Sequence, residues 1–204
     1  MAVHKFKILS LLILIAAFLV AGCAEEETRN SPSADITTFC NAILKSDDAS
    51  LQKIGMTKAE YQKELADEFV SSFNEAAEIN FSEQQIQPVM DAFFKVLNKT
   101  NFSVKDVSQE GDKATVAVTI DVLDKISEDD IIEFLSPELV LSGEDAVKDA
   151  VIKSLAYAVE GLPVAGSETF NVECVYHEKE KMWMPKDGKE FGVQLTEKLL
   201  GKNK

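Results

Sequence analysis

The chain has 204 residues, with 35 acidic and 21 basic side chains and a formal net charge of −14. An acidic protein repels phosphate groups, which argues against a nucleic-acid-binding protein and against a body that lies flat on an anionic leaflet. About 170 residues follow the amino-terminal segments, enough for one domain with its own core, and no Pro/Gly/Ser-rich stretch divides them.

Residues 1–22 have the layout of an export signal. His4, Lys5 and Lys7 precede an uncharged apolar run from Ile8 to Val20. A helix of that length rises only about 20 Å, whereas the hydrocarbon core of a bilayer is about 30 Å thick. The run is too short for a good permanent membrane span and fits the apolar part of a signal peptide.

The signal ends in Val20, Ala21, Gly22 and Cys23, which resemble the lipobox of bacterial lipoproteins. In that family the cysteine takes a diacylglycerol through its thiol, and cleavage leaves it as the first residue. The resemblance implies a chain held by lipid at the extracytoplasmic face of the cell membrane, or on an outer membrane. The alternatives are an ordinary secretory signal with an incidental cysteine, or an uncleaved anchor.

Cleavage before Cys23 would leave a mature chain with 19 basic and 35 acidic residues, a formal charge of −16. Residues 24–34 contain no large apolar side chain, so that residues 23–34 are predicted to form an acylated, flexible tether. Residues 35–204 are then expected to form a single domain.

Two cysteines remain besides the lipidated one, Cys40 and Cys174. A disulfide between them would close a loop of more than 130 residues, worth about 4 to 5 kcal/mol in the chain-entropy model. Both also lie on apolar stripes, where a free cysteine acts as a small core residue. A disulfide and two separate core thiols both fit the sequence.

Three helices are predicted before any strand. The first, over 36–45, has Asp35 as its N-cap. Capping boxes at Thr57 to Glu60 and at Ser82 to Gln85 open the other two, and Pro88 is expected to kink the third helix or delay its start. Their apolar stripes follow helical spacing: Ile36, Phe39, Cys40, Ile43 and Leu44; Tyr61, Leu65, Phe69 and Phe73; Ile86, Val89, Met90, Phe93, Phe94 and Leu97.

The spacing of the apolar residues then changes from a helical period to an alternation of apolar and polar residues. Apolar and polar residues alternate from Lys113 to Leu123, and a partner strand with Phe102, Val104 and Val107 precedes a turn at Gly111. This pattern predicts a β-hairpin.

Two helices and a second hairpin follow. Ser127 can cap a short helix before Pro137, and Ser142 a longer one that Gly161 and Pro163 end. A strand over 169–178 turns back through 182–184, and Asp187 can cap a final helix. The order of helices, hairpin, helices, hairpin and helix predicts an α+β domain with a curved antiparallel sheet of about four strands.

The strand pair from Phe102 to Ile120 and the closing segment from Lys181 to Asp187, together with the lipobox, give a second resemblance. The pattern is similar to lipoproteins of unknown function that are common in Firmicutes and are related to the nuclear-transport-factor-2-like, cone-shaped α+β superfamily. That resemblance implies an antiparallel sheet curled around a helix, with a pocket in the cone. Fold does not fix function, because members include isomerases, hydrolases and binding or dimerising modules.

Residue types needed for catalysis are scarce. His177 is the single histidine of the mature chain, it lies on the polar phase of a strand, and no nucleophile elbow accompanies it. No zinc-ligand spacing or phosphate-binding loop occurs, so no catalytic residue, metal or cofactor is predicted. The nearest acid pairs, Asp129 with Asp130 and Asp121 with Asp124, are explained by ordinary surface and helix-terminus positions.

Trp183 with Tyr176 could line a ligand pocket, although a tryptophan at the end of an amphipathic strand is usually a core residue. The leading hypothesis is a membrane-anchored, non-enzymatic module that binds a small ligand or a protein. The alternatives are an envelope enzyme that uses a carboxylate in the cone and an accessory protein of an envelope complex.

Overall fold

A computed structural model describes residues 29–77, 81–126 and 144–201. The signal segment, Cys23, most of the predicted tether, and the predicted helix that begins at Ser127 lie outside these ranges. The helices are α1 (Pro32–Lys45), α2 (Asp48–Lys53), α3 (Lys58–Ala77), α4 (Glu83–Lys99), α7 (Glu144–Glu160) and α8 (Gly188–Leu199). The strands are β1 (Phe102–Glu110), β2 (Lys113–Leu123), β3 (Val164–His177) and β4 (Met182–Pro185).

The four strands form one antiparallel sheet in the order β1-β2-β3-β4. The predicted hairpin is confirmed, with Phe102 opposite Ile120 and a bulge between Asp106 and Ser108. The turns after β1 and β3 meet at one end of the sheet, where the Tyr176 N–H donates to the Asp112 carbonyl oxygen at 2.9 Å. We call this the turn end. The start of β3, paired with the end of β2, marks the opposite end.

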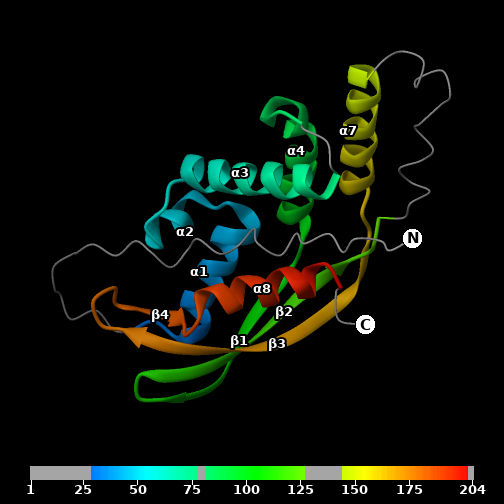
Figure 1. The fold of residues 1–204 in the computed structure, drawn as a ribbon. Helices are drawn as coiled ribbons and strands as arrows, with labels where there is room; N and C mark the ends of the chain where they lie inside the picture. The colour runs from blue at the N-terminus through cyan, green and yellow to red at the C-terminus, as the bar shows by residue number, and fades with distance from the viewer. Residues whose placement is uncertain (1–28, 78–80, 127–143, 202–204) are drawn as a thin grey trace.

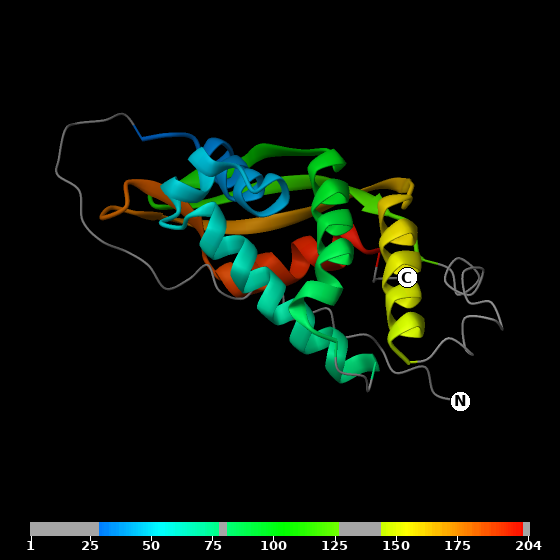
Figure 2. The ribbon, with the colours of Figure 1, turned by 90° about the horizontal axis from the view of Figure 1, so that it is seen from above.

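The helices lie on one side of this sheet, with α1 and α8 in direct contact with the strands (Figures 1 and 2). α2 packs on α1, α3 packs on α4, and α7 packs on α4. The predicted α+β class and the four-stranded antiparallel sheet are therefore confirmed.

Helix α1 begins earlier than predicted. Its N-cap is Ser31, whose hydroxyl accepts from the Ala34 N–H at 3.2 Å, and Pro32 occupies the first turn. Serine followed by proline is a favoured helix start because the missing proline N–H would have no intrahelical partner there. The prediction of Asp35 as N-cap was wrong, and the segment predicted as a tether up to residue 34 is already folded from Arg29.

The starts of α3, α4 and α8 follow the predicted capping residues, and Ser142, the predicted cap of α7, lies outside the described residues. The Glu60 N–H donates to the Thr57 hydroxyl at 3.2 Å before α3, and Ser82 with Gln85 forms a full capping box on α4. Helix α4 begins directly after Ser82, so Pro88 does not delay its start. Asp187 caps α8 as predicted, whereas the short helix α2 was not predicted.

The core lies between the sheet and the helices. Val116, Val118, Ile120 and Trp183 on the strands are fully buried, as are Ile36 of α1 and Leu195 of α8. The alternation predicted for β2 places its apolar side chains on this covered face. The opposite face presents half-buried or exposed side chains, among them Thr115, Ala117, Thr119, Thr169, Asn171 and Glu173.

Candidate functional site

A buried polar network joins the start of the described chain to β4. The Trp183 backbone N–H donates to Asp35 Oδ2 at 2.9 Å, and its indole Nε1–H donates to the Asn30 carbonyl oxygen at 3.0 Å. The remaining oxygen of Asp35 accepts from Asn30 Nδ2 at 2.8 Å. Both oxygens of this buried carboxylate are thus used in holding the chain together.

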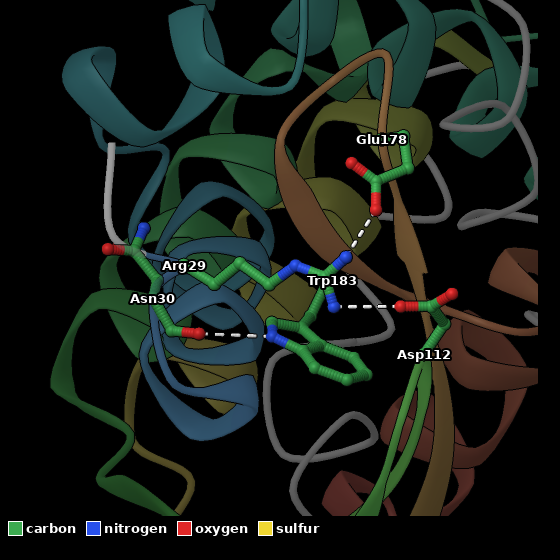
Figure 3. A network of polar contacts seen from close by, with 5 residues as sticks. All are labelled: Arg29, Asn30, Asp112, Glu178 and Trp183. Carbon is green, nitrogen blue, oxygen red and sulfur yellow. Dashed lines mark hydrogen bonds and ion pairs between the residues drawn. The ribbon is translucent and has the colours of Figure 1, made fainter. Parts of the chain in front are cut away.

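Arg29 adds an exposed layer to this network (Figure 3). Its guanidinium carbon lies 4.0 Å from the centre of the Tyr176 ring, a cation–π contact. One guanidinium nitrogen donates to Asp112 at 2.7 Å, and the other pairs with Glu178. Arg29 therefore bridges the two turns of the sheet.

The start of α1 is also held by β1. The Ser33 N–H and hydroxyl donate to the two oxygens of Asp106 at 2.7 and 2.8 Å. A carboxylate at a helix amino terminus is favoured by the exposed N–H groups and the helix dipole. We call the contacts of residues 29–35 with Asp106, Asp112, Tyr176, Glu178 and Trp183 the amino-terminal clamp.

The predicted pocket residues, Tyr176 and Trp183, do come together. Their rings make an edge-on contact with centres 5.4 Å apart. Trp183 is fully buried and Tyr176 is 8% exposed. The chain's own Arg29 and Asn30 occupy the polar contacts of this aromatic pair. One feature of the sequence could have indicated this arrangement: Arg29 is the only basic residue between Lys7 and Lys45.

A separate apolar recess opens between α1, α3, α4 and α8. It is narrow, with a cavity volume of about 20 Å³, enough for about one water molecule. Two of its polar groups are already paired, because Tyr61 donates to the Ile43 carbonyl oxygen at 2.8 Å and Thr196 to the Gly192 carbonyl oxygen at 3.0 Å. The lining residues are Ile43, Leu44, Tyr61, Leu65, Phe93, Leu97, Leu195, Thr196, Leu199 and Leu200.

Tyr61 is the one ionisable side chain among the residues that line this recess. Burial raises the pKa of the Tyr61 hydroxyl, so it stays neutral. Within the described ranges, no buried side-chain oxygen or nitrogen lacks a hydrogen-bond partner. The recess therefore presents an almost entirely apolar surface.

Cys40 and Cys174 are free, buried thiols in the structure. Of the two alternatives that fit the sequence, the structure therefore has two separate core thiols and not the disulfide. Burial raises the pKa of each thiol to about 12, and the nearby Asp106 carboxylate adds to the effect at Cys174. Both thiols stay protonated and unreactive at neutral pH.

The other residues considered as catalytic candidates either make contacts within the protein or lie outside the described residues. His177 is 40% exposed, and its Nδ1 lies 3.5 Å from Glu180. Asp121 accepts two hydrogen bonds from Asn101 at 2.8 and 2.9 Å, and Asp124 accepts from the Lys125 N–H. Asp129 and Asp130 are outside the described residues. The described part of the chain contains no group of three potential metal ligands.

Comparison with known proteins gives a fold relationship. No family model and no curated protein matches the chain. The crystal structure of a protein from Bacillus subtilis described as a lipoprotein, ycdA, is similar, with a TM-score of 0.59 and 19% sequence identity. The match covers 83% of this chain and 56% of that protein, so this chain spans little more than half of its length. Of the helices in the described ranges, none has both the length and the apolarity required to cross a bilayer.

Proposed function

We propose that this protein is an extracytoplasmic lipoprotein, anchored by acyl chains on Cys23, that acts as a non-enzymatic binding module. The lipobox-like sequence Val20 to Cys23 supports the anchor, and the fold similarity to a protein described as a lipoprotein agrees with it. The curved sheet packed against helices also supports our assignment of the domain to the nuclear-transport-factor-2-like superfamily.

The apolar recess carries the binding part of the proposal. Apolar side chains from four helices line it, and its tyrosine and threonine hydroxyls are paired within the chain. A ligand would gain free energy by removing apolar surface from water, at about 25 cal/mol per Å². We therefore propose that the recess takes the end of an aliphatic chain, with its lining side chains moving apart to admit it.

Thermal unfolding of the purified full protein tests this proposal. It should be measured with fatty acids of increasing length, with peptidoglycan fragments and with divalent cations. A ligand at 100 times its Kd stabilises by about 2.7 kcal/mol, which raises the Tm of a domain of this size by several degrees. We expect an aliphatic compound to give such a shift. The absence of a shift with every compound would count against small-ligand binding.

Two matched tryptophan variants locate the site. Leu200→Trp places a large side chain at the recess, whereas Val107→Trp places one on β1, where Val107 is 58% exposed and away from the recess lining. The first variant should lose the ligand-induced shift and the second should keep it. Retention of the shift in Leu200→Trp would place binding elsewhere.

The anchor has its own test. The mass of the amino-terminal peptide of the native protein should correspond to Cys23 with attached diacylglycerol. An unmodified Cys23, or a retained initiator methionine, would contradict the lipoprotein assignment.

A further inference from the structure

The amino-terminal clamp fixes the point from which any anchor must reach the bilayer. Arg29 is held at the turn end of the sheet by Asp112, Glu178 and the Tyr176 ring. The carbonyl oxygen of the next residue, Asn30, accepts the hydrogen bond of the fully buried Trp183 indole. The chain therefore leaves the domain at this one place.

Only five residues, 24–28, separate Cys23 from Arg29. Six residue steps of extended chain span at most about 20 Å. Strand β3 alone, with 14 residues, extends about 45 Å from the opposite end of the sheet to the turn end. The tether therefore keeps the turn end within about 20 Å of the bilayer, whereas it allows the opposite end to stand much farther away.

Charge favours the same orientation. The turn end carries four basic and four acidic residues: Arg29, Lys113, Lys179, Lys181, Glu110, Asp112, Glu178 and Glu180. The chain from Arg29 to Lys204 has 19 basic and 32 acidic residues, so the net negative charge lies elsewhere on the domain. An anionic leaflet repels that remainder within a Debye length of about 8 to 10 Å, whereas it does not repel a neutral end.

We infer that the turn end of the sheet is a membrane-facing surface, which the clamp and the short tether keep close to a lipid bilayer while the acidic remainder of the domain stands away from it. Helix α7, which leads into the start of β3, then lies at the end of the domain away from the membrane, where it is accessible to a partner in the envelope (Figure 1). This inference rests on the proposed lipid anchor and adds an orientation to it.

Energy transfer to the bilayer tests the orientation in the native, acylated protein. Lys179→Cys at the turn end and Lys153→Cys on α7 replace the same exposed residue type, so the two variants have equal charge. Cys40 and Cys174 are buried and Cys23 carries lipid, so a thiol dye labels the introduced cysteine selectively. The labelled proteins are reconstituted in vesicles of neutral and anionic phospholipid that contain a headgroup-linked acceptor.

We expect transfer from position 179 to exceed that from position 153 by several fold. Insertion of a 12-residue Gly/Ser linker between Glu27 and Thr28 should remove most of this difference, because the longer tether no longer restrains the turn end. Equal transfer from both positions, stronger transfer from position 153, or an unchanged difference after the insertion would overturn the orientation.

Vesicle flotation separates this result from failure of the anchor. A protein that floats with the vesicles but shows equal transfer contradicts the orientation and leaves the proposed anchor intact. A protein that does not float contradicts the anchor, and the orientation falls with it.

Discussion

The two faces of the sheet use the same strands in different ways. On the covered face, Val118 of β2 is fully buried under the helices. One residue further along, Thr119 turns to the other face and shares a hydrogen bond with Thr169 in an exposed setting. We therefore expect substitutions on the covered face to cost more stability than substitutions on the open face.

Trp183 should show the largest effect of any single substitution on the covered face. Trp183→Ala removes a fully buried aromatic side chain and its edge-on contact with the Tyr176 ring, so we expect a loss of about 3 to 5 kcal/mol in the free energy of unfolding. Urea denaturation measures it. Trp183→Phe keeps a ring but leaves the Asn30 carbonyl oxygen without its donor, and should cost less. A loss below 1 kcal/mol for Trp183→Ala would show that this part of the core is loosely packed.

Substitution of Asp35 tests the buried polar network beneath the helices. Asp35→Ala leaves the Trp183 backbone N–H and the Asn30 amide without an acceptor, which should cost about 1 to 3 kcal/mol. Asp35→Asn keeps one acceptor oxygen and should retain part of the stability. The control is Asp91→Ala on the exposed side of α4, expected to change stability by less than about 0.5 kcal/mol. Equal losses at positions 35 and 91 would contradict the role of the clamp.

Burial of the Cys40 thiol should make the protein less stable at alkaline pH. The folded protein raises the pKa of Cys40 from 9.0 to about 12, so its contribution is complete below pH 9 and declines as the pH rises toward 12. At pH 10 the unfolded chain has gained about 1.4 kcal/mol from ionising this one thiol. The difference in unfolding free energy between the wild type and Cys40→Ala should therefore narrow between pH 8 and pH 10. A difference that does not vary with pH would contradict the burial of the thiol.

The covered face was the more predictable part of the molecule. Alternation of period two placed Val116, Val118 and Ile120 on one face of β2, and capping residues located the starts of α3, α4 and α8. These are local patterns, in which a few neighbouring residues determine the structure. Ser31 and Pro32 also indicate the start of α1. The prediction placed this start later because the apolar stripe of the helix begins at Ile36.

The clamp could not be predicted in the same way. Asn30 lies 153 residues from Trp183 in the chain and accepts its hydrogen bond through a backbone oxygen, which every residue type possesses. Only the folded sheet brings the two together. The recess has the same character, since its leucines and phenylalanine follow ordinary core spacing on four different helices and their sequence does not show that a space remains between them.

The open face should give the smallest effect, and the Thr119 and Thr169 hydroxyls, 2.8 Å apart, provide the test. Single substitutions to alanine and the double substitution form a thermodynamic cycle, and cross-strand pairs of this kind couple by about 0.2 to 1 kcal/mol. We expect a value at the lower end, because water competes for both hydroxyls on an exposed surface. A coupling well above 1 kcal/mol would mean that water is excluded from this face, as it would be if a second copy covered it. Repeating the cycle at a tenfold lower protein concentration distinguishes these cases, since only a coupling that depends on association would fall on dilution.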